Sequence, residues 1–323
     1  MTKAEQRDGA GQQRKSRSLQ LTERDGRILA FFRAIRFAET SHFAGALVPN
    51  QFPTEEKLRR RLRKLAHMGY LDRPARRISR VRLSEFEIAG EEKPRGRPED
   101  IWALAQRGAD VLKLPGDWNK NNGRLRSSAF PHRLMISRVY STLMAAASRG
   151  LVTLDQWSGE NEWRGRIAVD GDSLPLIPDA VFILSDHRSD AQALVFLEAD
   201  NSTEPLRRTT MAQSSFFKKC LAYWHYWIDE IRPRHETMLV FTVAKTPDRA
   251  EALRLTTESV DEKGRGLNLF WFTHEATWEI ATPEKFLYEP IWTTAAGDQV
   301  ALFTDRNMTP RHITEVAQEN EHG

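Results

Sequence analysis

Several features that mark other protein classes are scarce or missing in this sequence. It contains one cysteine, Cys220, so an internal disulfide is excluded and a reducing, cytoplasmic environment is expected. No apolar run approaches the roughly 18 residues that a membrane-spanning helix needs, so no membrane association is expected. The sequence also lacks a glycine-rich phosphate loop and histidine pairs one helical turn apart. These absences argue against ATP or GTP use and against a zinc enzyme.

Charge is unevenly distributed along the chain. The 323 residues carry a formal net charge of +4. Residues 1–150 contain 31 Lys and Arg against 16 Asp and Glu, a net charge of +15, whereas residues 151–323 contain 17 against 28, a net charge of −11. A strongly basic region attracts a polyanion, and an acidic region repels it. We therefore expect the first half to bind nucleic acid and the second half to have a different task.

Helical signals organise the basic half. Thr22 is suited to be a helix N-cap, because acidic residues follow it directly and apolar residues then recur at helical spacing. A short helix is predicted over the segment SHFAGAL, and a third helix between Pro53 and Gly69. Two strands around a charged loop should follow. This order predicts a winged helix-turn-helix over residues 21–113.

Basic residues gather on the third predicted helix and in the segment after it. Arginines on a helix in the major groove reach guanine edges and phosphates, and a basic wing contacts the backbone or the minor groove. A solvated charged helix, or a winged helix that contacts protein, is the competing interpretation. The predicted DNA-binding residues are Lys57, Arg59, Arg60, Arg61, Arg63, Lys64, Arg76, Arg77, Arg80, Lys93, Arg95 and Arg97.

The second half follows a different order of elements. Its segments alternate as helix, strands, helix and strand, which is the order of the αβββαβ core of restriction-type nucleases. Strands rich in Val, Leu, Ile and Phe expect cover on both faces, so an α/β (α+β) class is predicted. The predicted organisation is a basic arm (1–20), a winged-helix domain (21–113), a linker (114–128), a nuclease-like domain (129–290) and a C-terminal extension (291–323).

Acidic residues lie at the ends of two adjacent predicted strands. Glu198 and Asp200 are two positions apart on one strand and should project from the same face. The polar turn before that strand should bring Asp179 to the same end of an antiparallel pair, and Glu160 is a further acid from upstream. Oxygen ligands suit Mg²⁺ or Mn²⁺, which would polarise a phosphodiester and generate a hydroxide. These four acids are the predicted metal ligands.

The helix predicted over residues 205–228 supplies candidates for contact with a phosphate. Lys219 and Tyr223 share one helical face, so Lys219 is the preferred candidate, with Tyr223 orienting it. Arg207 and Arg208 are alternative phosphate contacts. Ordinary surface charge is the competing interpretation of the lysine.

Several segments carry a resemblance to a known family. PDAVF, LVFLEADNSTE and KKCLAYWHYW, together with the helix PHRLMISRVY, resemble the replication-relaxation family of bacterial plasmids and mobile elements over roughly residues 20–290. The resemblance implies association with plasmid replication and DNA relaxation, and its core looks like the PD-(D/E)XK nucleases. It matches Asp179 and Glu198 to the two catalytic acids of that motif. Asp200 occupies the position where that motif usually has a lysine. Lys219 would take the role of this lysine.

Three functions remain open at this point. The first is a DNA-binding protein of a plasmid or mobile element with a metal-dependent nicking activity. The second is a non-catalytic regulator or replication factor, in which the nuclease-like fold is a platform for dimerisation or a partner. The third is a toxin or defence nuclease. Double-stranded DNA is the expected partner, and a homodimer and replication or transfer proteins are left open.

Overall fold

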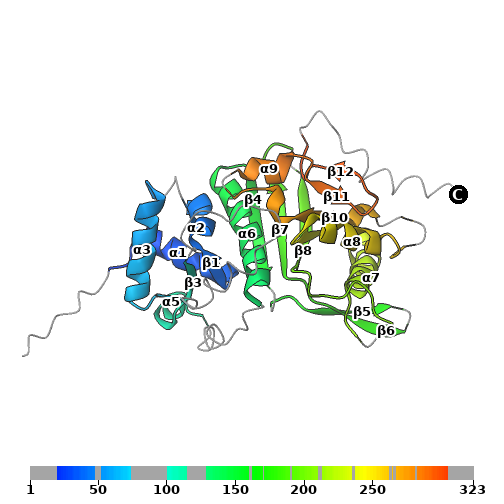
Figure 1. Cartoon of the computed structure of the whole chain (residues 1–323), viewed down its shortest axis with the longest axis horizontal. Coiled ribbons are helices and arrows are strands. Elements are labelled where there is room, and N and C mark those ends of the chain that lie inside the picture. Colours follow the sequence, from blue (N-terminus) through cyan, green and yellow to red (C-terminus); the bar gives the residue numbers. More distant parts are fainter. Residues whose placement is uncertain are drawn as a thin grey trace, which may run out of the picture.

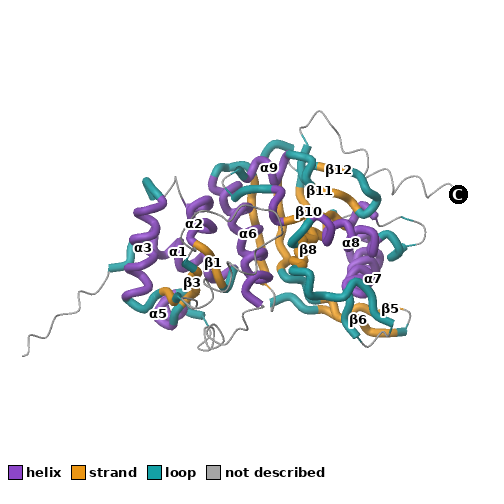
Figure 2. The backbone as a smooth tube through the Cα atoms, in the orientation of Figure 1, coloured by secondary structure: helices purple, strands orange, loops and turns teal. Residues whose placement is uncertain are grey.

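One long helix lies between two groups of helices and strands. Helix α6 (Ala129–Ser148) has a three-stranded sheet with its helices on one side and a seven-stranded sheet on the other (Figure 1). This computed structural model describes residues 20–47, 52–73, 100–114, 129–159, 162–169, 171–189, 191–209, 213–234, 237–261, 264, 267–280 and 282–304. Helices and mixed sheets are both present (Figure 2), which confirms the predicted α/β class. None of the helices within these ranges is long and apolar enough to cross a membrane.

The N-terminal unit, meaning the described residues of 20–114, runs in the order helix, strand, helix, helix, strand, strand, helix. Its elements are α1 (Glu23–Ala34), β1 (Phe37–Glu39), α2 (Thr40–Leu47), α3 (Glu55–His67), β2 (Leu71–Asp72), β3 (Ile101–Leu104) and α5 (Gln106–Val111). The strands form an antiparallel sheet of order β1-β3-β2. This order contains the three predicted helices followed by two strands, with β1 in addition, and the winged helix-turn-helix itself stays a prediction. The predicted loop between β2 and β3 lies outside the described residues.

Side-chain caps set the helix boundaries of the N-terminal unit. The Asp25 carboxylate accepts a hydrogen bond from the Thr22 backbone N–H at 2.7 Å, and Thr22 Oγ1 accepts one from the Asp25 N–H. Thr54 caps α3 through the N–H of Lys57. Gly69 follows α3 with φ +77°, a conformation that glycine adopts at little cost. These boundaries confirm the predicted starts of the first and third helices and the end of the third.

A seven-stranded sheet forms the centre of the C-terminal unit, meaning the described residues of 129–304. Its order is β12-β11-β10-β9-β8-β7-β4. The strands are β4 (Val152–Gly159), β7 (Ala180–Asp186), β8 (Gln192–Asp200), β9 (Met238–Ala244), β10 (Phe270–His274), β11 (Trp292–Thr294) and β12 (Gln299–Val300). Strands β4, β7 and β8 are antiparallel neighbours, and β9 is parallel to β8 and β10. Among the elements of this sheet and its covering helices, α6, β4, β7, β8, α7 (Phe216–Tyr226) and β9 follow one another in the order αβββαβ, and a nuclease core stays a prediction.

Helices cover both faces of this sheet. Helices α6 and α9 (Pro283–Tyr288) pack on one face, and α7 and α8 (Pro247–Thr257) on the other. Successive residues of β8 alternate between the two cores, with Val195 and Leu197 on the α6 side and Phe196 on the α7 side. The prediction of strands buried on both faces is confirmed.

The helix after β8 starts later than its sequence pattern suggests. It begins at Phe216 rather than near residue 205. The intervening segment turns back, and the carbonyls of Pro205 and Leu206 accept hydrogen bonds from the N–H groups of Phe216 and Phe217. These carbonyls satisfy N–H groups that a helix start otherwise leaves unpaired. The buried residues of α7 include Phe216, Cys220, Tyr223 and Trp224, whereas Phe217 and Leu221 are half-buried.

Two further features of this unit were not predicted from sequence. β5 (Gly165–Val169) pairs with β6 (Asp172–Leu176) in a separate hairpin that packs against α7 instead of joining the large sheet. In addition, β11 and β12 extend that sheet beyond residue 290, where the nuclease-like domain was predicted to end.

The two units share a continuous packed core. Phe130 and Leu134 of α6 belong to one buried cluster with Phe37 of β1. The ring of Tyr140 lies 4.9 Å from that of Phe31 in α1. Trp157 of β4 donates a hydrogen bond to the carbonyl of Ala34 at 3.1 Å. Helix α6 therefore joins the units through buried apolar contacts.

Candidate DNA-binding surface and acidic site

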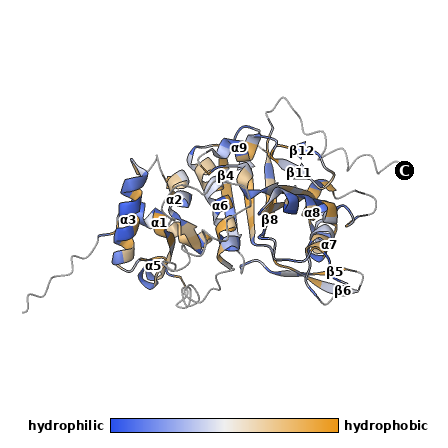
Figure 3. Ribbon diagram, in the orientation of Figure 1, coloured by the Kyte–Doolittle hydropathy of each residue, from blue (hydrophilic) through white to orange (hydrophobic). Residues whose placement is uncertain are grey.

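Exposed basic residues line α3. Leu58, Leu62 and Leu65 are fully buried, so the opposite side of this helix faces solvent. Four residues of that side, here called the basic stripe, are exposed: Lys57, Arg60, Arg63 and Lys64. Figure 3 shows α3 as a largely hydrophilic helix at the end of the molecule away from the large sheet. The stripe is therefore open to a partner.

Two other arginines of α3 that were predicted to contact DNA have partners within the protein. Arg61 pairs with the fully buried carboxylate of Asp25, the residue that completes the cap of α1. This hydrogen bonding raises the pKa of Arg61, so it holds α3 against α1 as a cation. Arg59 pairs with Glu55 at 2.5 Å on the surface, where an ion pair is weak and exchangeable. The remaining candidates, Arg76, Arg77, Arg80, Lys93, Arg95 and Arg97, lie outside the described residues.

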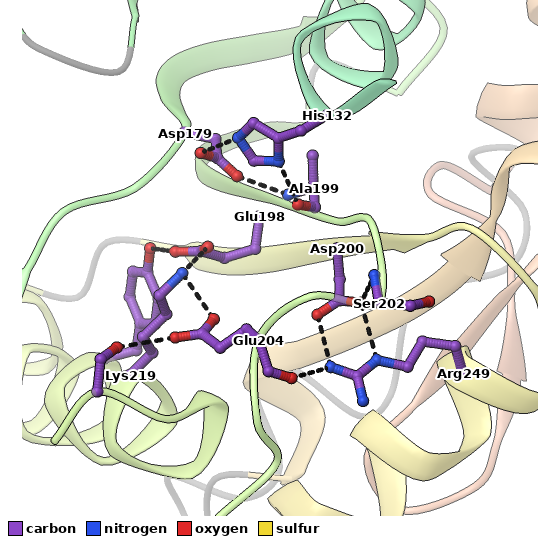
Figure 4. Close-up of polar contacts among 11 residues, drawn as sticks. His132, Asp179, Glu198, Ala199, Asp200, Ser202, Glu204, Lys219 and Arg249 are labelled. Atoms are coloured by element: carbon purple, nitrogen blue, oxygen red, sulfur yellow. Dashed lines mark hydrogen bonds and ion pairs between the residues drawn. The ribbon is translucent and has the colours of Figure 1, made fainter. Parts of the chain in front are cut away.

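Asp179, Glu198 and Asp200 lie at one corner of the large sheet, here called the acid corner (Figure 4). The N–H of Asp179 donates to the carbonyl of Leu197, and the register of β7 and β8 places Asp179 opposite Glu198. All three carboxylate residues are buried. The antiparallel approach of these acids, predicted from the turn between the strands, is confirmed, and the fourth acid, Glu160, lies outside the described residues.

His132 of α6 is the partner of Asp179. Its Nε2 lies 3.0 Å from Asp179 Oδ1, and its Nδ1 lies 2.8 Å from the carbonyl oxygen of Ala199. Both ring nitrogens face acceptors, so only the doubly protonated ring donates to both. The second Asp179 oxygen accepts a hydrogen bond from the Ala199 N–H at 2.8 Å. Burial acts to raise the pKa of Asp179, but His132, Lys219 and the Ala199 N–H together outweigh burial, and the pKa is lowered.

Lys219 and Tyr223 of α7 are the partners of Glu198. Lys219 Nζ lies 3.0 Å from one Glu198 oxygen, and the Tyr223 hydroxyl donates to the other at 2.6 Å. Lys219 therefore points into the acid corner, from the helical face that the sequence spacing indicates. Burial raises the pKa of Glu198 to about 7 in spite of the nearby ammonium. Burial acts to lower the pKa of Lys219, but Glu198 and Glu204 outweigh it and raise that pKa.

Arg249 of α8 is the partner of Asp200. Its Nε and Nη2 donate to the two Asp200 oxygens at 2.8 and 2.9 Å, a bidentate geometry that favours a strong pair. Asp200 projects from the same face of β8 as Glu198, as predicted, but its carboxylate forms an ion pair with Arg249. Within the part of the chain that the structure describes, no group of three His, Cys, Asp or Glu side chains is placed to hold a metal ion. The predicted metal site, which also includes Glu160, stays a prediction.

Three residues of this site were not predicted from sequence: His132, Glu204 and Arg249. His132 stands in the PHRLMISRVY helix and Glu204 follows the E-x-D motif, but neither has a local pattern that indicates its contact.

The alternative phosphate contacts lie in the loop after β8. Arg207 stacks 4.1 Å from the Phe217 ring centre and donates to Ser259, and Arg208 is exposed.

The comparison with protein families identifies the chain. The family model described as replication-relaxation matches residues 29–238, more than half of the sequence, so the chain belongs to the replication-relaxation family. The matched span contains the basic stripe, the acid corner and the partners of the acid corner apart from Arg249. Membership supports a role in the replication or relaxation of a plasmid or mobile element. No curated protein and no solved structure matches the chain.

Proposed function

We propose that this protein binds double-stranded DNA through α3 and acts in this way in the replication or relaxation of a plasmid or mobile element. The basic stripe carries the proposal, because its four cations are exposed while the opposite side of the helix is packed. Cations on one face of a helix contact phosphates and base edges in the major groove. In the helix order of the N-terminal unit, α3 has the place of a recognition helix.

A binding measurement tests this assignment. Fluorescence anisotropy with a labelled duplex should show that Arg60→Gln/Lys64→Gln weakens DNA binding by about tenfold or more, since two phosphate contacts are lost. The matched control is Arg27→Gln/Arg33→Gln, which removes the same charge from exposed positions of α1. The control should bind nearly as well as the wild type. Equal losses in both variants would refute a specific role of α3.

Nicking of DNA at the acid corner is a second candidate function. The favourable observation is that Asp179 and Glu198 lie opposite each other with Lys219 Nζ 3.0 Å from Glu198. Mg²⁺ is commonly held by one or two carboxylates, with waters and substrate phosphate completing its shell, so this pair has a suitable donor set. Bound there, Mg²⁺ or Mn²⁺ would polarise a phosphodiester. Lys219 would neutralise charge on the phosphate, and Tyr223 would hold Glu198 in place.

Incubation of supercoiled origin-bearing plasmid with Mg²⁺ or Mn²⁺ tests this second function. Nicking predicts an open-circular product that disappears in Asp179→Asn and Glu198→Gln. Asp200→Asn, if folded, should still give the open-circular product, because Asp200 is paired with Arg249. Absence of product from the wild type would instead favour a non-catalytic replication factor, whose nuclease-like fold serves as a platform.

A further inference from the structure

The carboxylate of Glu204 lies beside the first turn of α7. Ser214 Oγ donates to one oxygen of Glu204 at 2.9 Å, and Lys219 Nζ lies 3.0 Å from the other (Figure 4). Glu204 comes from the loop after β8, whereas Ser214 lies two residues before α7 and Lys219 lies in its first turn. The start of a helix favours anions, because the helix dipole is positive there. Glu204 thus occupies a place that suits an anion.

A buried hydroxyl lies at the same helix start. Ser215 is the N-cap residue of α7, is only 1% exposed, and its Oγ has no hydrogen-bond partner among the described residues. The N–H of Lys219 donates to the Ser215 carbonyl, so the two residues are one helical turn apart. A buried hydroxyl without a partner is costly and is normally satisfied by a ligand or a water. The helix start therefore has hydrogen-bonding capacity that Glu204 does not use.

Lys219 forms ion pairs with two carboxylates, the inner Glu198 and the outer Glu204. The side chain of Glu198 is 5% exposed, that of Glu204 is 21% exposed, and that of Lys219 is 31% exposed. Glu198 lies on a central strand and is also held by Tyr223. Glu204 lies on a loop, and an anion that approaches from solvent would compete with it rather than with Glu198.

We propose that Lys219 and the start of α7 form a binding site for a DNA phosphate, which Glu204 occupies as an internal mimic until DNA displaces it. The inference rests on the proposed function in that DNA is the ligand. The exchange replaces one anion by another at the same cation and involves no covalent step. DNA held by α3 raises the local concentration of phosphate at the rest of the protein, which favours the exchange. The acidic C-terminal unit would then contact DNA only after the N-terminal unit has bound it.

The binding of a labelled random-sequence duplex by the full chain, measured over a range of salt concentrations, tests the inference. Glu204→Gln keeps the shape of the side chain but frees Lys219. It should bind several-fold more tightly, with a slope of log affinity against log salt that is steeper by about 0.9, the value for one added phosphate contact. Ser214→Ala removes the other contact to Glu204 and should act in the same direction, which provides a second variant if Glu204→Gln does not fold.

The matched control is Glu284→Gln, which removes the same charge from a carboxylate that pairs with Arg149 at 2.9 Å elsewhere in the C-terminal unit. It should leave the slope unchanged. Adding Lys219→Gln to Glu204→Gln should abolish the gain. Equal behaviour of Glu204→Gln and Glu284→Gln, a gain that persists without Lys219, or no DNA binding by any variant would overturn the inference. A gain specific to Glu204→Gln would support it even if the α3 variants bound normally and the proposed role of α3 failed.

Discussion

The two units use charge in opposite ways. On α3, the leucines are buried and the four cations of the basic stripe remain in solvent. At the acid corner the carboxylates of Asp179, Glu198 and Asp200 are buried, and each is paired with a basic side chain. Exposed charge attracts a polyanion at long range, whereas buried charge must be paired to be tolerated. The comparison teaches that the net charge of a region does not show which of its charges are available to a partner.

The largest predicted effect on stability comes from comparing a paired arginine of α3, Arg61, with an exposed arginine of the same helix, Arg63. Arg61→Gln leaves the fully buried Asp25 carboxylate without its cation and should lower the free energy of unfolding by roughly 3–5 kcal/mol. Arg63→Gln makes the same change at an exposed position and should cost less than about 0.5 kcal/mol while weakening DNA binding. Urea unfolding and anisotropy measure both effects. Similar unfolding free energies for the two variants would show that Arg61 is a surface residue like Arg63.

A pH dependence is predicted for the acid corner. Burial raises the pKa of Glu198 from 4.5 to about 7, so the folded state holds this proton more tightly than the unfolded state does. The stabilising contribution is fully present below pH 4.5 and is lost as the pH rises through about 7. In Glu198→Gln this loss, about 3 kcal/mol, should be absent. Urea unfolding of both proteins at several pH values between these limits checks the difference, and parallel curves would contradict it.

A smaller effect tests whether the two units depend on each other. A Cβ atom added at Gly45 of α2 would meet the side chain of Ile280 in the C-terminal unit, whereas one added at Gly26 of α1 has open space. Gly45→Ala should therefore destabilise the protein by roughly 1–2 kcal/mol. Gly26→Ala should stabilise it by roughly 0.5–1 kcal/mol through helix propensity. Thermal unfolding of the two variants measures both changes in stability. Stabilisation by both substitutions would indicate that the units are not packed as described.

Much of the local structure could be predicted from sequence. The starts of α1 and α3 follow from Thr22 and Thr54, because capping acts over a few residues. The pairing of β7 with β8 follows from two apolar runs and the polar turn between them. Lys219 was placed on the correct helical face because helical spacing is regular.

The partners of the buried charges could not be predicted in this way. Asp25 and Arg61 are 36 positions apart, and Asp200 and Arg249 are 49 positions apart. Periodicity shows which face of an element a side chain occupies, but not which element packs against that face. Spacing placed Glu198 and Asp200 on one face, as observed, yet gave no sign that α8 would bring Arg249 to that face.

The salt dependence of DNA affinity tests the role of the basic stripe most directly. The measurement compares the wild type with the variant Lys57→Gln/Arg60→Gln/Arg63→Gln/Lys64→Gln, after circular dichroism has shown that both are folded. If each of the four cations neutralises one phosphate, the slope of log affinity against log salt should become shallower by about 3.6 in the variant. An unchanged slope would mean that DNA binds elsewhere on the molecule, and it would contradict the assignment of α3 as the DNA-binding helix.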